Sequence, residues 1–187
     1  MARKAVHIVD AAKSLDLFFG DFGKAVVEGS PMACALIATS VVENSLMTLL
    51  TTFFVEGSTT EKMFGSRGLL GDFFKCTQIA YCIGLIPKRV KQNLKKIAEI
   101  RNAFAHSRTL IDFQDANIVS LCSELTLPKG TKPTTVAYVS DKYPPSRLRF
   151  TLVCGLLGQH LVAYAALYAN PLAVHRGQLK RPVAAEW

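Results

Sequence analysis

Two long apolar segments constrain the fold of this chain more than any other feature of its sequence. They run from Pro31 to Val55 and from Thr151 to Ala169, so each is nearly long enough to span a bilayer. Each also carries polar side chains near its middle, Glu43 in the first and His160 in the second. Such groups are costly inside a membrane but compatible with the interior of a helical bundle. We therefore predict two buried helices of a soluble protein, with no membrane insertion.

Size, charge and cysteine content narrow the class of protein further. The 187 residues fit one domain with a sizeable core, and a hydrophobic fraction of 50% excludes a disordered chain. The net charge of +8 favours an anionic partner, either nucleic acid or an acidic protein. Five cysteines without C-x-x-C spacing are typical of reduced thiols in a cytoplasm. From these thiols we predict a cytoplasmic protein. The four histidines are not spaced as zinc ligands are, so we also predict no metal and no cofactor.

Helical periodicity and capping residues predict an all-α fold. Ser30 and Pro31 are typical of a helix start, and Gly84 of a helix end. The expected helices cover residues 4–28 (one or two helices), 31 to about 57, 61–64 after a Thr60 cap, 72–83, 87 onward, a helix through 125 capped within 112–115, and 146–169. The connection over 126–145 has room for a short strand at 135–139. We predict a single helical domain over residues 1–170, followed by a basic, flexible tail over 171–187.

The helix that begins at Pro87 carries the residues with the greatest chemical potential. Apolar residues three, four and seven positions away place Arg101 on the apolar stripe of this helix. Asn102 and His106 are four residues apart and share one face. Arg101 and His106 are separated by about 7.5 Å along the axis if the helix persists. A flexible arginine and an imidazole at this spacing could hold one phosphate between them.

These residues have two interpretations. Histidine can transfer a proton near neutral pH and arginine can bind a phosphate, so the pair could promote attack of a ribose 2′-hydroxyl on the adjacent phosphodiester without a metal. Alternatively, His106 interacts with the helix dipole and Arg101 is held by a buried carboxylate. Glu43 is the only charged residue of its apolar helix. We therefore predict a hydrogen bond or salt bridge between Arg101 and Glu43.

The same helix has a run of basic residues on its polar side. They form either a binding face for nucleic acid or an acidic partner, or a solvated helix face. The run consists of Lys88, Arg89, Lys91, Lys95 and Lys96. The sequence has no glycine-rich phosphate loop, no nucleophile elbow and no convincing DNA-reading motif.

The motif and its surroundings resemble two related groups of proteins. The pattern Arg101-Asn102-x-x-x-His106 is similar to the R-x4-6-H motif of the HEPN (higher eukaryotes and prokaryotes nucleotide-binding) superfamily. Residues 30–125 resemble the mannitol operon repressor family, within or near that superfamily. This second resemblance rests on the order and spacing of FFVEG at 53–57, LGDF at 70–73, AYCIGLI at 80–86 and IRNAFAH at 100–106.

The resemblance implies a HEPN-like helical bundle, here with an additional C-terminal helix, that forms a homodimer. It also implies a role in transcriptional regulation, through a protein partner rather than a DNA-reading helix. Many HEPN proteins are metal-independent ribonucleases in which arginine and histidine from two subunits face each other. A second function therefore stays open, that of a toxin or defence endoribonuclease with Arg101, Asn102 and His106 as catalytic residues and Glu43 in support.

Overall fold

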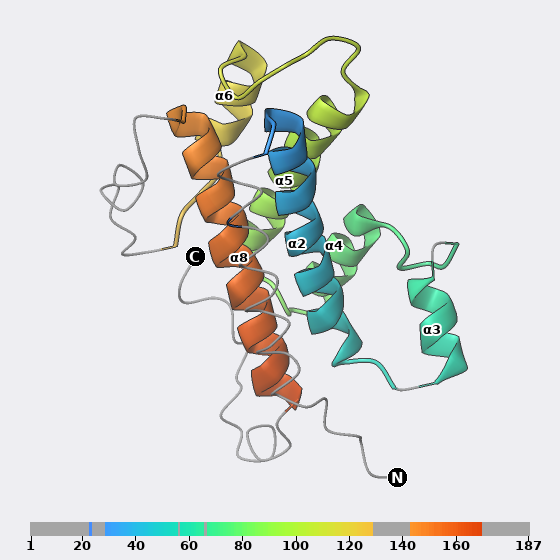
Figure 1. Cartoon of the computed structure of the whole chain (residues 1–187). Coiled ribbons are helices and arrows are strands. Elements are labelled where there is room, and N and C mark those ends of the chain that lie inside the picture. The colour runs from blue at the N-terminus through green and yellow to red at the C-terminus, as the bar shows by residue number, and fades with distance from the viewer. Residues whose placement is uncertain (1–22, 24–28, 56, 66, 129–142, 170–187) are drawn as a thin grey trace.

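The computed structural model describes residues 23, 29–55, 57–65, 67–128 and 143–169, and this part of the chain is all-α (Figure 1). Its helices are α2 (Pro31–Thr51), α3 (Ser58–Phe64), α4 (Phe73–Cys82), α5 (Lys88–His106), α6 (Ala116–Ser123) and α8 (Pro145–Ala169). The predicted fold class is confirmed. The helices expected over 4–28, the strand expected at 135–139 and the tail 171–187 lie almost entirely outside the described residues.

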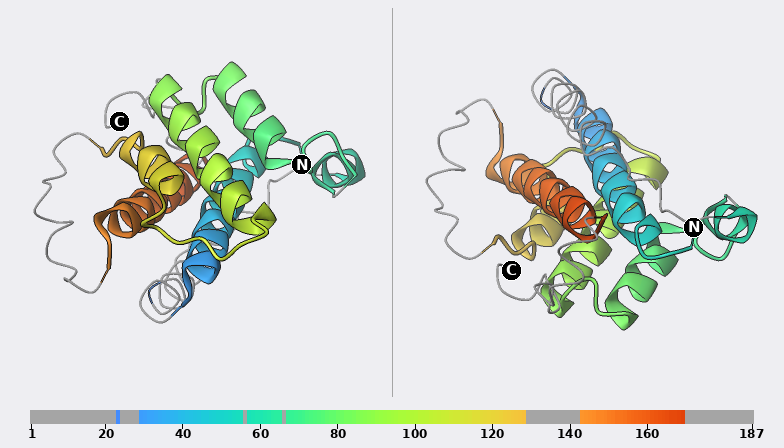
Figure 2. Two further views of the ribbon diagram at one scale, coloured as in Figure 1. Left: turned by 90° about the horizontal axis from the view of Figure 1, so that it is seen from above. Right: turned by 90° about the horizontal axis from the view of Figure 1, so that it is seen from below.

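The two long apolar segments form helices α2 and α8, which pack against each other. Figure 2 shows them crossing in one layer, with α4, α5 and α6 in a second layer on the same side of the pair. At the crossing, a Cβ atom on Gly158 would lie 3.2 Å from a side-chain carbon of Val41 and 3.4 Å from the hydroxyl of Ser45. The helices approach this closely because glycine has no side chain there.

Helices α2 and α8 are also the candidate membrane spans of the described chain. Each is long and apolar enough to cross a bilayer, with mean hydropathies of 1.5 and 1.6. However, 56% of the most apolar window of α2 and 44% of that of α8 are buried within the protein. This burial accounts for much of their apolar composition, and the absence of membrane insertion stays a prediction.

Helix α2 begins at a side-chain cap, whereas α3 begins without one. The Ser30 hydroxyl accepts a hydrogen bond of 3.2 Å from the Ala33 amide, and Pro31 occupies the first helical position, as predicted. Helix α3 begins differently from the prediction, because Gly57 precedes it and no side chain caps it. Thr60 lies inside this helix, where its hydroxyl donates to the Val55 carbonyl at 2.5 Å.

The end of α2 also differs from the prediction. The helix ends at Thr51 rather than near Gly57. Threonines and aromatic residues follow, and both have low helix propensity. The chain instead turns so that Phe53 packs edge-on against Tyr168 of α8, with ring centroids 4.5 Å apart. Helix α2 therefore ends about six residues before the predicted position, and Phe53, just after its end, packs against α8.

Helices α4 and α5 form a helical hairpin. The Asp72 carboxylate caps α4 by accepting from the Lys75 amide at 3.1 Å. Gly84 follows α4 with a φ of 78°, a conformation that favours glycine, so its predicted role as a helix end is confirmed. Helix α5 then begins directly after Pro87.

Candidate functional site

In the last turns of α5, the residues of the arginine-histidine motif are exposed and their apolar neighbours are buried in the core. Ile100 and Phe104 are fully buried and continue the inner stripe of the helix. Arg101, Asn102 and His106 are all exposed. The Arg101 Nη1 atom donates a hydrogen bond of 2.9 Å to the Asn102 side-chain oxygen, so the guanidinium is directed towards the residue that shares a face with His106.

The predicted contact between Arg101 and Glu43 is wrong. Arg101 is exposed and forms no ion pair with any carboxylate of the described residues. The angular position of Arg101 on α5 is close to the buried stripe, as its spacing indicated. The side chain nevertheless reaches solvent because no described helix covers this side of α5.

Unequal helix lengths explain this exposure. Helix α4 has 10 residues and α5 has 19, which correspond to about 15 Å and about 28 Å. Because a short turn joins them, α4 runs back along the N-terminal half of α5 alone. Figure 1 shows the C-terminal turns of α5 extending beyond α4. Arg101 lies in those turns, so its side is left uncovered.

Glu43 lies in a different environment, a small pocket between α2 and α4. It is half-buried there beside Asp72 and Cys76. Burial, together with the negative charges of Glu43 and Asp72, raises the pKa of the Cys76 thiol to about 11. This thiol donates to the Leu70 carbonyl at 3.1 Å. Glu43 therefore belongs to the α2–α4 contact and not to the end of α5.

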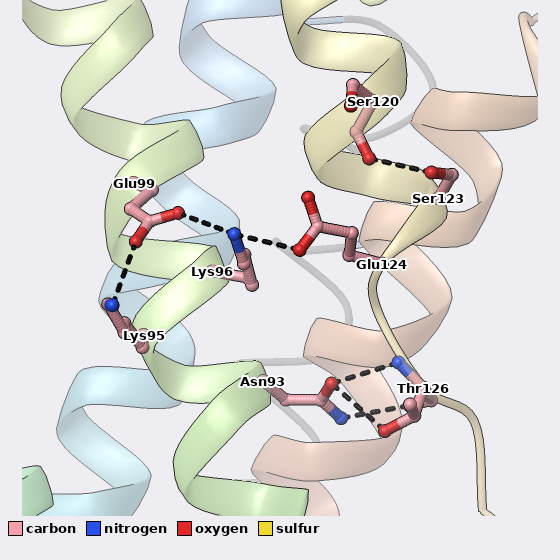
Figure 3. Close-up of polar contacts among 8 residues, drawn as sticks. All are labelled: Asn93, Lys95, Lys96, Glu99, Ser120, Ser123, Glu124 and Thr126. Atoms are coloured by element: carbon pink, nitrogen blue, oxygen red, sulfur yellow. Dashed lines mark hydrogen bonds and ion pairs between the residues drawn. The ribbon is translucent and has the colours of Figure 1, made fainter.

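The predicted basic face of α5 is divided by carboxylates, as Figure 3 shows. The Lys96 ammonium lies 2.9 Å from the Glu124 carboxylate and 3.1 Å from that of Glu99. The hydrogen bond to Glu124 is the main cause of a raised pKa of Lys96, and the hydrogen bond to Glu99 raises this pKa further. Lys95 also pairs with Glu99, at 3.7 Å. The C-terminal half of the basic run is therefore partly neutralised.

The N-terminal half of the basic run has different surroundings. The Lys91 ammonium lies over the Tyr81 ring of α4, 4.3 Å from its centroid. Lys88 and Arg89 are exposed and form no ion pair within the described part of the chain. Within the basic run, the positive charge that no carboxylate neutralises therefore lies where α4 joins α5, and the motif lies at the opposite end of α5.

Sequence reasoning missed a group of polar residues that connect the helices. Buried Asn93 of α5 donates to the Thr126 carbonyl and accepts from the Thr126 amide, both at 2.9 Å (Figure 3). Arg149 of α8 donates twice to the Leu125 carbonyl, at 2.9 and 2.6 Å. Buried Arg147 donates to the Gly29 carbonyl at 2.8 Å. Their signal in the sequence is a polar residue at a position that helical periodicity assigns to the core.

Comparison with known proteins gives one informative result. No protein-family profile and no curated protein sequence matches the chain. Among solved structures, a chain in the X-ray structure of the MtlR–HPr complex from Escherichia coli is similar in fold, with a TM-score of 0.58. The alignment covers 81% of this chain and 99% of that chain at 17% sequence identity. This chain has an MtlR-like fold. At this identity the likeness shows the fold alone.

Proposed function

We propose that this chain is a regulatory protein of the mannitol operon repressor type that acts by binding a protein partner. The observation that carries the proposal is the likeness in fold, over most of both chains, to a protein solved in complex with HPr. The exposed positive charge where α4 joins α5 gives this chain a surface on which a partner can dock. HPr is the first partner to test.

Two measurements test this function together. In calorimetry, the full chain is expected to bind HPr, or another regulatory protein, from the organism that encodes this chain. Deletion of the gene is expected to change transcript levels of a defined set of genes, and the wild-type gene should restore them. Unchanged transcripts under every carbon source examined would contradict a regulatory role.

A second function is supported by the exposure of the motif. Arg101, Asn102 and His106 all reach solvent, and Arg101 is directed towards Asn102. This arrangement is compatible with a metal-independent HEPN-type endoribonuclease, in which His106 transfers a proton and Arg101 binds the phosphate. The carboxylate of Glu99 lies on the same outer side of α5, which lowers the attraction for RNA next to the motif.

The nuclease alternative is tested with purified protein, RNA and EDTA. If the site is catalytic, His106→Ala should abolish cleavage and leave RNA affinity nearly unchanged. Arg101→Ala should reduce both, because its charge would contact the phosphate. Arg108→Ala is the matched control, since Arg108 is exposed just beyond the helix. Equal activity of wild type and His106→Ala would exclude this role of the histidine.

A homodimer is part of both functions. In the nuclease alternative, arginine and histidine from two subunits would face each other, so a dimer built on α5 would complete the site. Light scattering at micromolar concentration should give twice the monomer mass. A particle of 20.4 kDa would contradict the dimer.

A further inference from the structure

The turn between α4 and α5 presents apolar and basic side chains together. We call this the elbow surface and define it as Tyr81, Ile83, Lys88, Arg89 and Lys91. Tyr81 is 38% exposed and Ile83 is 50% exposed, and the Lys91 ammonium lies over the Tyr81 ring. Lys88 and Arg89 are exposed in the first turn of α5, five and six residues after Ile83. Large apolar side chains this open, next to charged residues, are typical of interaction surfaces.

The backbone of the turn holds Ile83 outward. Gly84 adopts a φ of 78°, and the chain then inserts Leu85 and Ile86 into the core, where they are 4% and 2% exposed. Because these two residues anchor the turn, Ile83 cannot reach the core by a small movement. The side chain is therefore presented to solvent by a well-fixed segment, which lowers the entropic cost of binding there.

The charged residues of α4, of the first three turns of α5 and of the turn that joins them have a single sign. Residues 73–98 contain six Lys and Arg residues and no Asp or Glu. Asp72 lies at the other end of α4, about 15 Å away, and Glu99 is held by Lys95 and Lys96. No carboxylate of the described residues pairs with Lys88 or Arg89. An occupant of this surface should therefore be negatively charged.

We propose that the elbow surface docks an acidic protein segment, which places an apolar side chain against Ile83 and Tyr81 and carboxylates against Lys88 and Arg89. The proposal rests on the proposed function as a regulator that binds a protein, and it names the surface and the chemistry of the partner. Burial of Ile83 on binding contributes to the affinity for the segment. Attraction to Lys88 and Arg89 orients the acidic segment and raises its association rate.

Other occupants fit this surface less well. A single-stranded nucleic acid needs open aromatic faces for stacking, but Lys91 already covers one face of the Tyr81 ring, and Ile83 is aliphatic. A second copy of the chain would bring the same positive charge, and like charges in contact are unfavourable. An acidic and partly apolar protein segment matches both halves of the surface.

The test uses the full chain and three labelled probes in fluorescence anisotropy. The first probe is a synthetic helical peptide with glutamates around a leucine face, the second has serine in place of each leucine, and the third is a uridine-rich RNA. The wild type is expected to bind the leucine peptide most tightly. Ile83→Ser and the double variant Lys88→Glu with Arg89→Glu should each weaken that binding roughly tenfold or more.

Matched controls separate the elbow surface from general charge and general apolarity. Lys62→Glu with Arg67→Glu reverses the same two residue types at exposed positions in and just after α3. Leu110→Ser removes a large apolar side chain that is 100% exposed. Both controls should bind the leucine peptide as the wild type does. All these positions are exposed, so circular dichroism should show intact folding.

Three results would overturn the proposal: no binding of the leucine peptide, equal losses in elbow and control variants, or tighter binding of the RNA or the serine peptide. None of them decides the proposed function, because the deletion and transcript experiment tests regulation without reference to this surface. Conversely, unchanged transcripts would remove the regulatory role and leave the peptide measurement intact.

Discussion

The inner and outer sides of helix α5 differ in burial and polarity over the same length of helix. On the inner side, Ile97, Ile100 and Phe104 are fully buried. On the outer side, the chain exposes charged and polar groups as far as Asn102 and His106. Residues that stabilise the fold and candidate functional residues are therefore separated on this helix by rotation about its axis, and at Arg101 by position along the axis beyond the end of α4. Substitutions on the inner side should change the free energy of unfolding, and those on the outer side should change binding or chemistry.

The largest expected effect is that of Phe104→Ala on the inner side. Phe104 is fully buried, and its ring lies 4.9 Å from that of Phe113. Removal of a buried phenylalanine side chain leaves a cavity and should lower the free energy of unfolding by about 4 kcal/mol in urea denaturation. Leu110→Ala is the control, because its side chain is 100% exposed and should cost almost nothing. Equal effects in the two variants would refute the assigned core.

Asn93→Leu should have the next largest effect. Asn93 is 1% exposed and bonds both the amide and the carbonyl of Thr126. Leucine fills a similar volume but leaves those two backbone groups without this partner, which should cost about 2 kcal/mol. Gln92→Leu, at the exposed neighbouring position, is the control. A neutral Asn93→Leu variant would mean that water replaces the lost bonds.

Glu124→Gln tests the ion pair at the border between the two sides and should have a small effect that depends on pH. The Glu124 and Glu99 carboxylates hold the pKa of Lys96 above its ordinary value of 10.5. The pair therefore contributes its full stability below that value and loses it as the pH rises through the folded-state pKa. Melting temperatures of wild type and Glu124→Gln should differ slightly at neutral pH and converge at strongly alkaline pH. A constant difference would assign the effect to packing.

The smallest effects on stability are expected for Arg101→Ala and His106→Ala. Both side chains are exposed, and the hydrogen bond of Arg101 is to its neighbour Asn102. Each substitution should change the free energy of unfolding by less than about 0.5 kcal/mol. A loss of several kcal/mol in Arg101→Ala would instead support a buried pairing of this guanidinium and would blur the contrast between the two sides.

The helical class and most helix boundaries of this protein follow from its amino-acid sequence. Ser30, Pro31, Asp72 and Gly84 act through contacts within a few residues, so their roles follow from the local sequence. The inner stripe of α5 likewise follows from its periodicity. The end of α2 at Thr51 was not predicted, and the contact that follows it, between Phe53 and Tyr168, joins residues far apart in the chain that local sequence does not relate.

The surroundings of the candidate residues depend on how the helices pack and could not be predicted from local sequence. Arg101 is exposed because α4 is shorter than α5, and Glu43 faces Asp72 and Cys76 because α4 packs on α2 there. Lys96 meets Glu124 because the chain following α6 lies beside α5. Helical periodicity specifies the angle of a side chain about its own axis. It does not specify how far the neighbouring helix extends, and that distance decides whether a charge at that angle is buried, paired or open to a partner.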